Sequence, residues 1–227
     1  MFRAIAVVLS LAFVAVACGR HETPAEKTTH ARENQARDVA RKAGLSVPVQ
    51  DFLALYATAA SNTFSVTYGP SPAGTSIVLL QDPPQRRVDV VAPPVTRSVF
   101  VTRQGTYECS LQDQKWSCQQ SQQQEGAPGL LAPADIDRTV AELKSARTNY
   151  TFTVTSKKVA NTDTRCLVTT PRPGVGGGGS TLCLSSRGAV LLVEGAGNPL
   201  RAVRYSTSVD SRRLALPAQP EPPQPKP

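Results

Sequence analysis

The stretch TFSVTYGPSPAGTSIVLLQDPPQRRVDVVA, residues 63–92, decides the fold class. In its first part, Phe64, Val66 and Tyr68 alternate with small polar residues, which is the period of a β-strand with one apolar face. The turn signals PSPAG and DPPQ separate this strand from TSIVLLQD and RRVDVVA. Strands joined by such short links pair in opposite directions, so the stretch predicts an antiparallel sheet.

The same strand pattern recurs on both sides of a helical segment. PADIDRTVAELKSAR (133–147) reads as a helix capped by Asp135, with Ile136, Val140 and Leu143 on one face. VQDFLALYATAA (49–60) has its apolar residues at helical spacing and predicts another helix, just before the first strand. Further strands are expected at 96–103, 105–111, 115–120, 149–159, 163–170, 180–188, 189–197 and 200–210.

This element order predicts an α+β fold. About ten strands would form one curved antiparallel sheet, a half-barrel, with two or three helices on its concave side. The domain is expected to span residues 48–216. Residues 18–47 read as a polar tether containing a short helix at ENQARDVARKAG (33–44), and the proline-rich residues 217–227 as a disordered tail.

The first residues carry an export signal. Residues 1–17 have a basic start and a short apolar run, too short to span a bilayer, and they end in AVAC with the cysteine at position 18. Two interpretations compete. Ordinary signal peptidase could cut after Ala17, or AVAC could be a lipobox in which the Cys18 thiol receives a diacylglycerol. We favour the lipobox, which predicts a lipid anchor on the extracytoplasmic face of the cell membrane.

Cysteine counting supports this interpretation. The chain has five cysteines, and an odd number in an exported protein needs an explanation. If Cys18 is acylated, four remain. Cys109 and Cys118 lie on adjacent predicted strands, and Cys166 and Cys183 on another adjacent pair. The strand assignment therefore predicts two structural cross-strand disulfides, Cys109–Cys118 and Cys166–Cys183.

Charge and motifs exclude several functional classes. The net charge of +8 suits anionic lipid or wall polymers, but no basic stripe with interleaved aromatics indicates nucleic acid, and surface solvation explains the charge more simply. GVGGGG (174–179) precedes a strand instead of a helix, so it does not indicate a dinucleotide site. Both histidines, His21 and His30, fall in the tether, which argues against a catalytic triad and a metal site. No cofactor, metal or enzymatic activity is expected.

Several segments in order resemble a known family. They are FLALYATAA, TFSVTYG, IVLLQDPPQRRVDVV, SVFVTRQGTYEC and, most specifically, TLCLSSRGAVLLVEGAGNPLRAVRYSTSV. Together, over residues 48–216, they resemble the LolA/LolB-like half-barrel, including its LppX/LprG-like lipoproteins. The resemblance implies binding of acyl chains or lipidated molecules between sheet and helices, without catalysis or cofactor. The two cystines depart from the general pattern and indicate a distinct subgroup.

Two functional hypotheses follow. The first is a membrane-anchored lipoprotein that binds or carries an apolar or lipidic ligand in the half-barrel cavity. The second is a ligandless interaction or sensor module of the envelope that docks a protein partner; the sequence does not fix the oligomeric state. Residues expected to face the interior either line a cavity or fill it, and the sequence leaves both open. They are Phe64, Val66, Tyr68, Ile77, Leu79, Phe152 and Val154.

Overall fold

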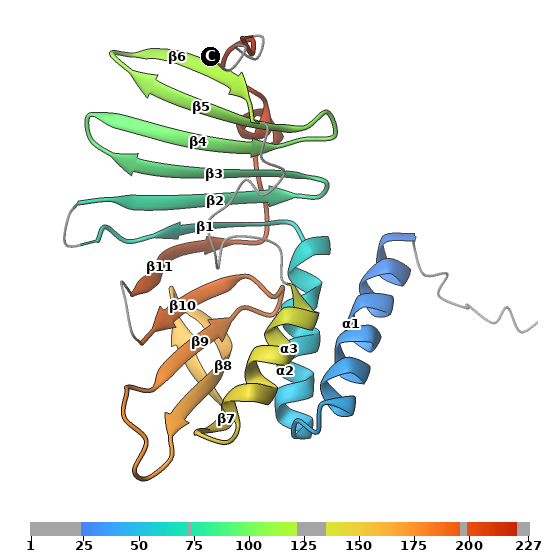
Figure 1. The fold of residues 1–227 in the computed structure, drawn as a ribbon. Coiled ribbons are helices and arrows are strands. Elements are labelled where there is room, and N and C mark those ends of the chain that lie inside the picture. The colour runs from blue at the N-terminus through green and yellow to red at the C-terminus, as the bar shows by residue number, and fades with distance from the viewer. Residues whose placement is uncertain (1–23, 72–73, 122–134, 196–198, 222–227) are drawn as a thin grey trace, which may run out of the picture.

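A computed structural model describes residues 24–71, 74–121, 135–195 and 199–221 (Figure 1). Three α-helices, α1 (Pro24–Lys42), α2 (Val47–Thr58) and α3 (Ile136–Ala146), accompany a single sheet. Short 3-10 helices, η1 (Ala59–Ser61) and η3 (Ser211–Leu214), follow α2 and the last strand. The strands are β1 (Phe64–Tyr68), β2 (Ser76–Asp82), β3 (Gln85–Ala92), β4 (Val95–Val101), β5 (Thr106–Gln112), β6 (Lys115–Gln120), β7 (Tyr150–Val159), β8 (Thr162–Pro171), β9 (Ser180–Leu184), β10 (Val190–Glu194) and β11 (Leu200–Ser206).

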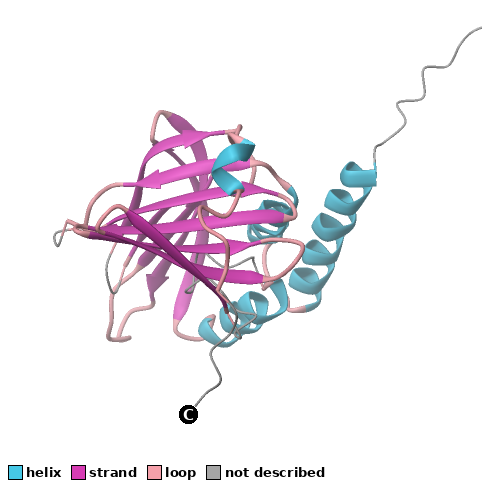
Figure 2. Cartoon of the chain, turned by 90° about the horizontal axis from the view of Figure 1, so that it is seen from above, coloured by secondary structure: helices cyan, strands magenta, loops and turns pink. Residues whose placement is uncertain are grey.

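The sheet contains all eleven strands in the order β6-β5-β4-β3-β2-β1-β11-β10-β9-β8-β7. Every adjacent pair is antiparallel. The sheet therefore consists of two meanders, β1–β6 and β7–β11, that join where β1 pairs with β11. Figure 2 shows the curvature of this open sheet from above. The prediction of an α+β fold, with about ten strands in one curved antiparallel sheet and two or three helices, is confirmed by the eleven strands and three α-helices of the described residues.

Tight turns hold the meanders together. Asp113 and Gln114 link β5 to β6 with positive φ angles of 49° and 63°, and Ala160 and Asn161 link β7 to β8 in the same way. Two central residues in the left-handed region match the right-handed twist of an antiparallel pair. Each turn thus fixes the register of its hairpin.

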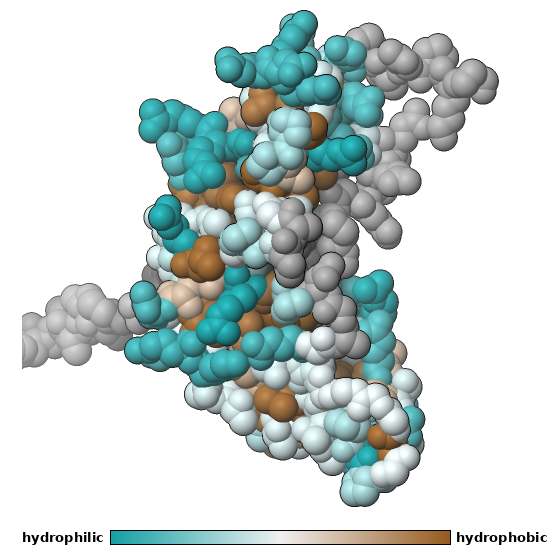
Figure 3. Space-filling model, turned by 90° about the vertical axis from the view of Figure 1, so that its left-hand side faces the viewer, coloured by the Kyte–Doolittle hydropathy of each residue, from teal (hydrophilic) through white to brown (hydrophobic). Residues whose placement is uncertain are grey.

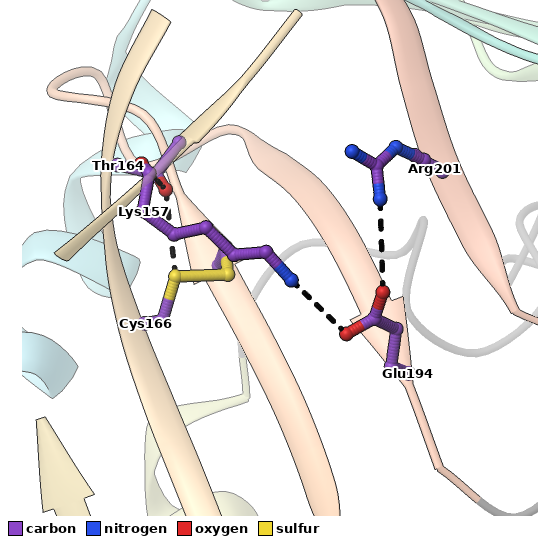
Figure 4. The surroundings of a disulfide bond; sticks show 6 residues. Lys157, Thr164, Cys166, Glu194 and Arg201 are labelled. Carbon is purple, nitrogen blue, oxygen red and sulfur yellow. Dashed lines mark hydrogen bonds and ion pairs between the residues drawn. A yellow bond between two sulfur atoms is a disulfide. The ribbon is translucent and has the colours of Figure 1, made fainter. Parts of the chain in front are cut away.

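Both predicted disulfides are present and bridge residues directly opposite each other. Cys109 pairs with Cys118 across β5 and β6, and Cys166 with Cys183 across β8 and β9. All four side chains are buried. Figure 4 shows the second disulfide beneath ion pairs that Glu194 makes with Lys157 (3.3 Å) and Arg201 (3.8 Å). This environment fits a structural bond.

Helix α1 is longer and better packed than a tether with a short helix would be. Its Ala36 and Ala40 are completely buried, and it lies along α2 (Figure 1). Arg37 also forms an ion pair with Asp51 of α2 (3.1 Å). Small side chains four residues apart let two helices approach closely, so α1 belongs to the folded domain although its composition is polar.

Helix α3 has the expected cap and buried face. The side chain of Asp135 accepts a hydrogen bond from the Arg138 backbone N–H (3.0 Å). Val140 is buried, with Ile136 and Leu143 partly buried beside it. The helices lie on the side of β7–β10: α2 contacts β7 and β8, and α1 packs against α2 and α3 (Figure 1).

Three groups of side chains form the core, and we name them by position. The seam cluster surrounds the β1–β11 junction, the helix cluster lies between the helices and β8–β10, and the tail cluster lies at β4–β6. The tail cluster contains Phe100, Tyr107 and the Cys109–Cys118 disulfide, with Trp116, Leu216 and Ala218 against them.

The chain after β11 crosses the sheet to reach this cluster. Leu214 of η3 is buried, and the Glu221 backbone N–H donates to the Cys118 carbonyl (2.9 Å) at the outer edge of β6. Residues 217–221, which the sequence assigned to a disordered tail, therefore lie against the sheet. Apolar Leu216 and Ala218, on either side of Pro217, provide the contact.

Candidate ligand-binding site

The seven residues expected to face the interior separate into two groups. Phe64, Val66, Tyr68 and Leu79 are buried in the seam cluster, with Ile77 packed against it. Phe152 and Val154 are partly buried in the helix cluster. At these positions side chains fill the space between the elements, so the structure does not bring the seven together around one cavity. Cys18, the expected lipid attachment site, lies outside the described residues.

Tyr68 illustrates this filling. Its side chain is 1% exposed, and its hydroxyl donates to the Val190 carbonyl oxygen of β10 (2.7 Å). Burial raises the pKa of the Tyr68 hydroxyl, because the phenolate would be poorly solvated there. The residue thus joins the two meanders as a neutral hydrogen-bond donor.

One face of β2–β4 stays apolar beyond the packed core. Residues directly opposite each other in an antiparallel pair share a face. The register aligns Leu79 with Val88 and Val88 with Val99, and in the neighbouring rows Ile77 with Val90 and Arg86 with Val101. We call six of these residues the apolar floor: Ile77, Leu79, Val88, Val90, Val99 and Val101.

The outer part of the floor is half-buried. Val90, Val99 and Val101 belong to none of the three core clusters, in contrast to Leu79 and Val88. The face becomes polar at the next strand, where Glu108 lies opposite Val99. The helices cover the other half of the sheet, so they do not roof this part (Figure 1).

Arg86 lies at the end of this floor. It shares the face, opposite Gln81 on β2 and Val101 on β4, and is only 8% exposed. Within the described part of the chain its guanidinium has no hydrogen-bond or ion-pair partner, and its Nε is completely buried. Gln81, the polar neighbour in the same row, donates instead to the carbonyls of Ala59 and Asn62.

The electrostatic surroundings of Arg86 are two tyrosines. Tyr68 of β1 and Tyr56 of α2 both interact with its charge, and Tyr56 also senses Arg138 and Glu142 of α3. Burial lowers the pKa of the Arg86 guanidinium to about 10, because the charged form is poorly solvated. At neutral pH Arg86 is therefore a buried cation, close to the junction of the sheet with the helices.

The neighbouring arginine, Arg87, has partners for its guanidinium. Arg87 points to the opposite face, where its Nε donates to Asp89 (2.6 Å) and its Nη1 to the Arg213 carbonyl (2.8 Å). Its guanidinium also lies over the Phe100 ring, 4.8 Å from the centroid. Arg86 and Arg87 are thus adjacent in sequence and opposite in environment.

Sequence reasoning missed Arg86, although a signal was present. In QRRVDVV the alternation places Arg86 on the same face as Val88 and Val90. A charged residue in register with an apolar face marks either a buried ion pair or a ligand contact.

A second, polar groove lies elsewhere. Its volume is about 680 Å³, and α1, α2 and the β7–β8 hairpin form its walls. None of the seven expected residues lines it. Its charged lining comes from Glu33, Arg37, Asp51, Lys157, Lys158, Asp163 and Arg165. Both signs of charge are present, and the ion pairs are solvent-exposed, so the groove suits polar contacts and not an acyl chain.

The described surface has little continuous apolar area. Figure 3 shows hydrophobic surface on one side of the molecule only as patches between hydrophilic side chains. The exposed large hydrophobic residues among those described are Val47 and Val203, on different elements. Among the described surfaces, the apolar floor is therefore the face best suited to an apolar ligand.

Among the described residues, no three histidine, cysteine, aspartate or glutamate side chains are grouped so that they could hold a metal ion. Within the same ranges, no helix combines the length and the apolar character needed to cross a bilayer.

Comparison with known proteins adds one structural likeness. No protein-family model matches the chain, and no curated protein matches it. The chain is similar to a crystal structure of MucB, with a TM-score of 0.43 and 16% sequence identity. The match covers 76% of this chain and 64% of that one, so the chain spans less than two thirds of the length of MucB.

Proposed function

We propose that this protein is a membrane-anchored, exported binding protein whose ligand carries an apolar chain that lies on the apolar floor. One observation carries the proposal. The apolar face of the sheet continues past the packed core to the half-buried Val90, Val99 and Val101. Covering such a face with a hydrocarbon chain removes apolar surface from water. This stabilises the complex by about 25 cal/mol for each Å² that is buried.

The size of the floor limits the ligand. Neighbouring strands lie about 4.8 Å apart, so the distance from β2 to β4 is about 10 Å. That distance accommodates one acyl chain or a comparable apolar group. Phe64, Val66 and Tyr68 continue the same face on β1, where the seam cluster is filled, so they bound the floor on that side.

A binding assay with a neutral apolar probe tests the proposal. N-phenyl-1-naphthylamine should bind the full-length exported protein saturably, and Val99→Gln should weaken it at least about tenfold, because an unpaired amide would face the probe. Val99→Thr, which keeps the shape, should weaken it less. Val203→Gln, at an exposed position on β11, is the matched control and should leave the affinity for the probe unchanged. Absence of saturable binding, or equal binding by Val99→Gln, would refute the proposal.

The anchor is a separate part of the proposal and has its own test. It rests on the sequence AVAC at Cys18. Mass spectrometry of the mature N-terminus should find an acylated cysteine, and Cys18→Ser should move the protein from the membrane to the soluble fraction. An unmodified mature N-terminus would contradict this part and leave ligand binding to be judged by the probe assay.

The alternative function, docking of a protein partner without a small ligand, has one observation in its favour. The polar groove between α1, α2 and the β7–β8 hairpin presents charges of both signs. Charge reversal at Lys158 and Arg165 should abolish cross-linking to a stoichiometric partner in intact cells if this groove is the docking site. Unchanged cross-linking would exclude it.

A further inference from the structure

We propose that Arg86 binds the head of the ligand, and that this head is a single carboxylate at the end of the apolar chain. The inference rests on the proposed function, because it adds a head-group contact to a chain lying on the apolar floor. Arg86 occupies the end of that floor, in the same row as Val101. A head group bound there leaves its chain over Val88 and Val99, in the adjacent row.

The first argument is the missing partner. Arg86 is more than nine-tenths buried, yet among the described residues no carboxylate, carbonyl or hydroxyl accepts a hydrogen bond from its guanidinium. Buried charges in folded proteins are paired or coordinated, because an isolated one is costly. The remaining donors of Arg86 therefore suit an acceptor that the described residues do not supply.

The second argument concerns the groups around it. Tyr68 already donates its hydroxyl hydrogen to Val190, and Gln81 donates to Ala59 and Asn62. Both side chains direct their hydrogens to backbone carbonyls, and within the described residues neither oxygen accepts a hydrogen bond from the guanidinium. Tyr56 of α2 lies near enough to interact with the charge of Arg86.

The third argument is charge balance. Arg86 contributes one positive charge, and its planar fork matches the two oxygens of a carboxylate. A doubly charged phosphate would leave one negative charge buried without compensation. The next cation on the same face, Arg97, is opposite Val90 and exposed to solvent. The site is therefore complementary to a monoanion.

Three probes with the same chain and different heads test the inference: dodecanoate, dodecanol and dodecyl phosphate, titrated by calorimetry into the delipidated full-length exported protein at neutral pH. The wild type should bind dodecanoate about 10- to 100-fold more tightly than dodecanol, as expected for hydrogen bonds to a charged group. Dodecyl phosphate should bind more weakly than dodecanoate.

Variants then assign the preference. Arg86→Met should reduce dodecanoate binding to the level of dodecanol and leave dodecanol binding unchanged, whereas Arg86→Lys should retain part of the preference. Arg97→Met, a cation on the same face, is the control and should keep the wild-type ratio. Circular dichroism checks that each variant is folded.

The outcomes separate the two proposals. Binding of all three probes with no head-group preference, or a preference that survives Arg86→Met, overturns the role of Arg86 and leaves the apolar floor as a binding site. Tighter binding of the phosphate overturns the carboxylate assignment. If no probe binds the wild type, the proposed function fails and this inference fails with it.

Discussion

Replacing Arg86 by methionine should stabilise the protein in the absence of ligand. The charged guanidinium is buried, and its pKa falls to about 10. At about 1.4 kcal/mol for each tenfold change in the protonation constant, this lowering corresponds to about 3 kcal/mol of destabilisation at neutral pH. Methionine has a similar length and no charge to desolvate. Allowing for imperfect packing of the new side chain, we expect a gain of about 1–3 kcal/mol, in the range seen when buried charges are replaced by apolar residues.

Urea denaturation of wild type and Arg86→Met measures this change. The midpoint should rise without a change in slope, and the melting temperature should rise by about 2–4 °C per kcal/mol for a domain of this size. Arg97→Met, at an exposed position on the neighbouring strand, should change stability by less than about 0.5 kcal/mol. If Arg86→Met is equally stable or less stable than the wild type, then Arg86 has a compensating partner and the reasoning about an unpaired cation is wrong.

Three further predictions follow from the core. Removing the Cys109–Cys118 disulfide by a double change to alanine should cost about 2.7 kcal/mol, since nine positions separate the cysteines; an unchanged urea midpoint would contradict this. Leu214→Ala should cost about 2–4 kcal/mol because a buried side chain is lost, and protease sensitivity after β11 should rise with it; resistance equal to wild type would show that η3 is not held there. Tyr68→Phe should cost about 1 kcal/mol at neutral pH. Burial raises the pKa of Tyr68, so its contribution is present below about pH 10 and is lost at higher pH, where the unfolded chain ionises first. The difference between variant and wild type should therefore shrink in alkaline urea titrations, and a constant difference would contradict the role of burial.

The strands and disulfides could be predicted from sequence because their signals are local. Alternation in 63–92 and the short proline- or glycine-containing links define β1–β3. Once two cysteines are assigned to adjacent antiparallel strands, their pairing follows from register, as Cys166 and Cys183 show. The Asp135 cap is likewise determined by neighbours within one turn.

The features that sequence reasoning missed depend on contacts between distant segments. Helix α1 packs through buried alanines. Alanine is only weakly apolar, so the sequence of this mostly polar helix shows no clear apolar face. Leu216 and Ala218 contact the sheet only because the chain turns back after β11. The environment of Arg86 depends on α2 and β1 as well as on β3, so alternation could place the residue on a face but could not show that the described residues offer its Nε no partner.

The pairing of β1 with β11 has a consequence for biogenesis. Each meander can form from hairpins between consecutive strands, but β1 meets its second neighbour only after about 130 further residues have been made. Until then one edge of β1 exposes unpaired backbone groups, which are a template for association with other chains. Closure of this long-range pair should therefore be the slow, aggregation-sensitive step when the polypeptide folds.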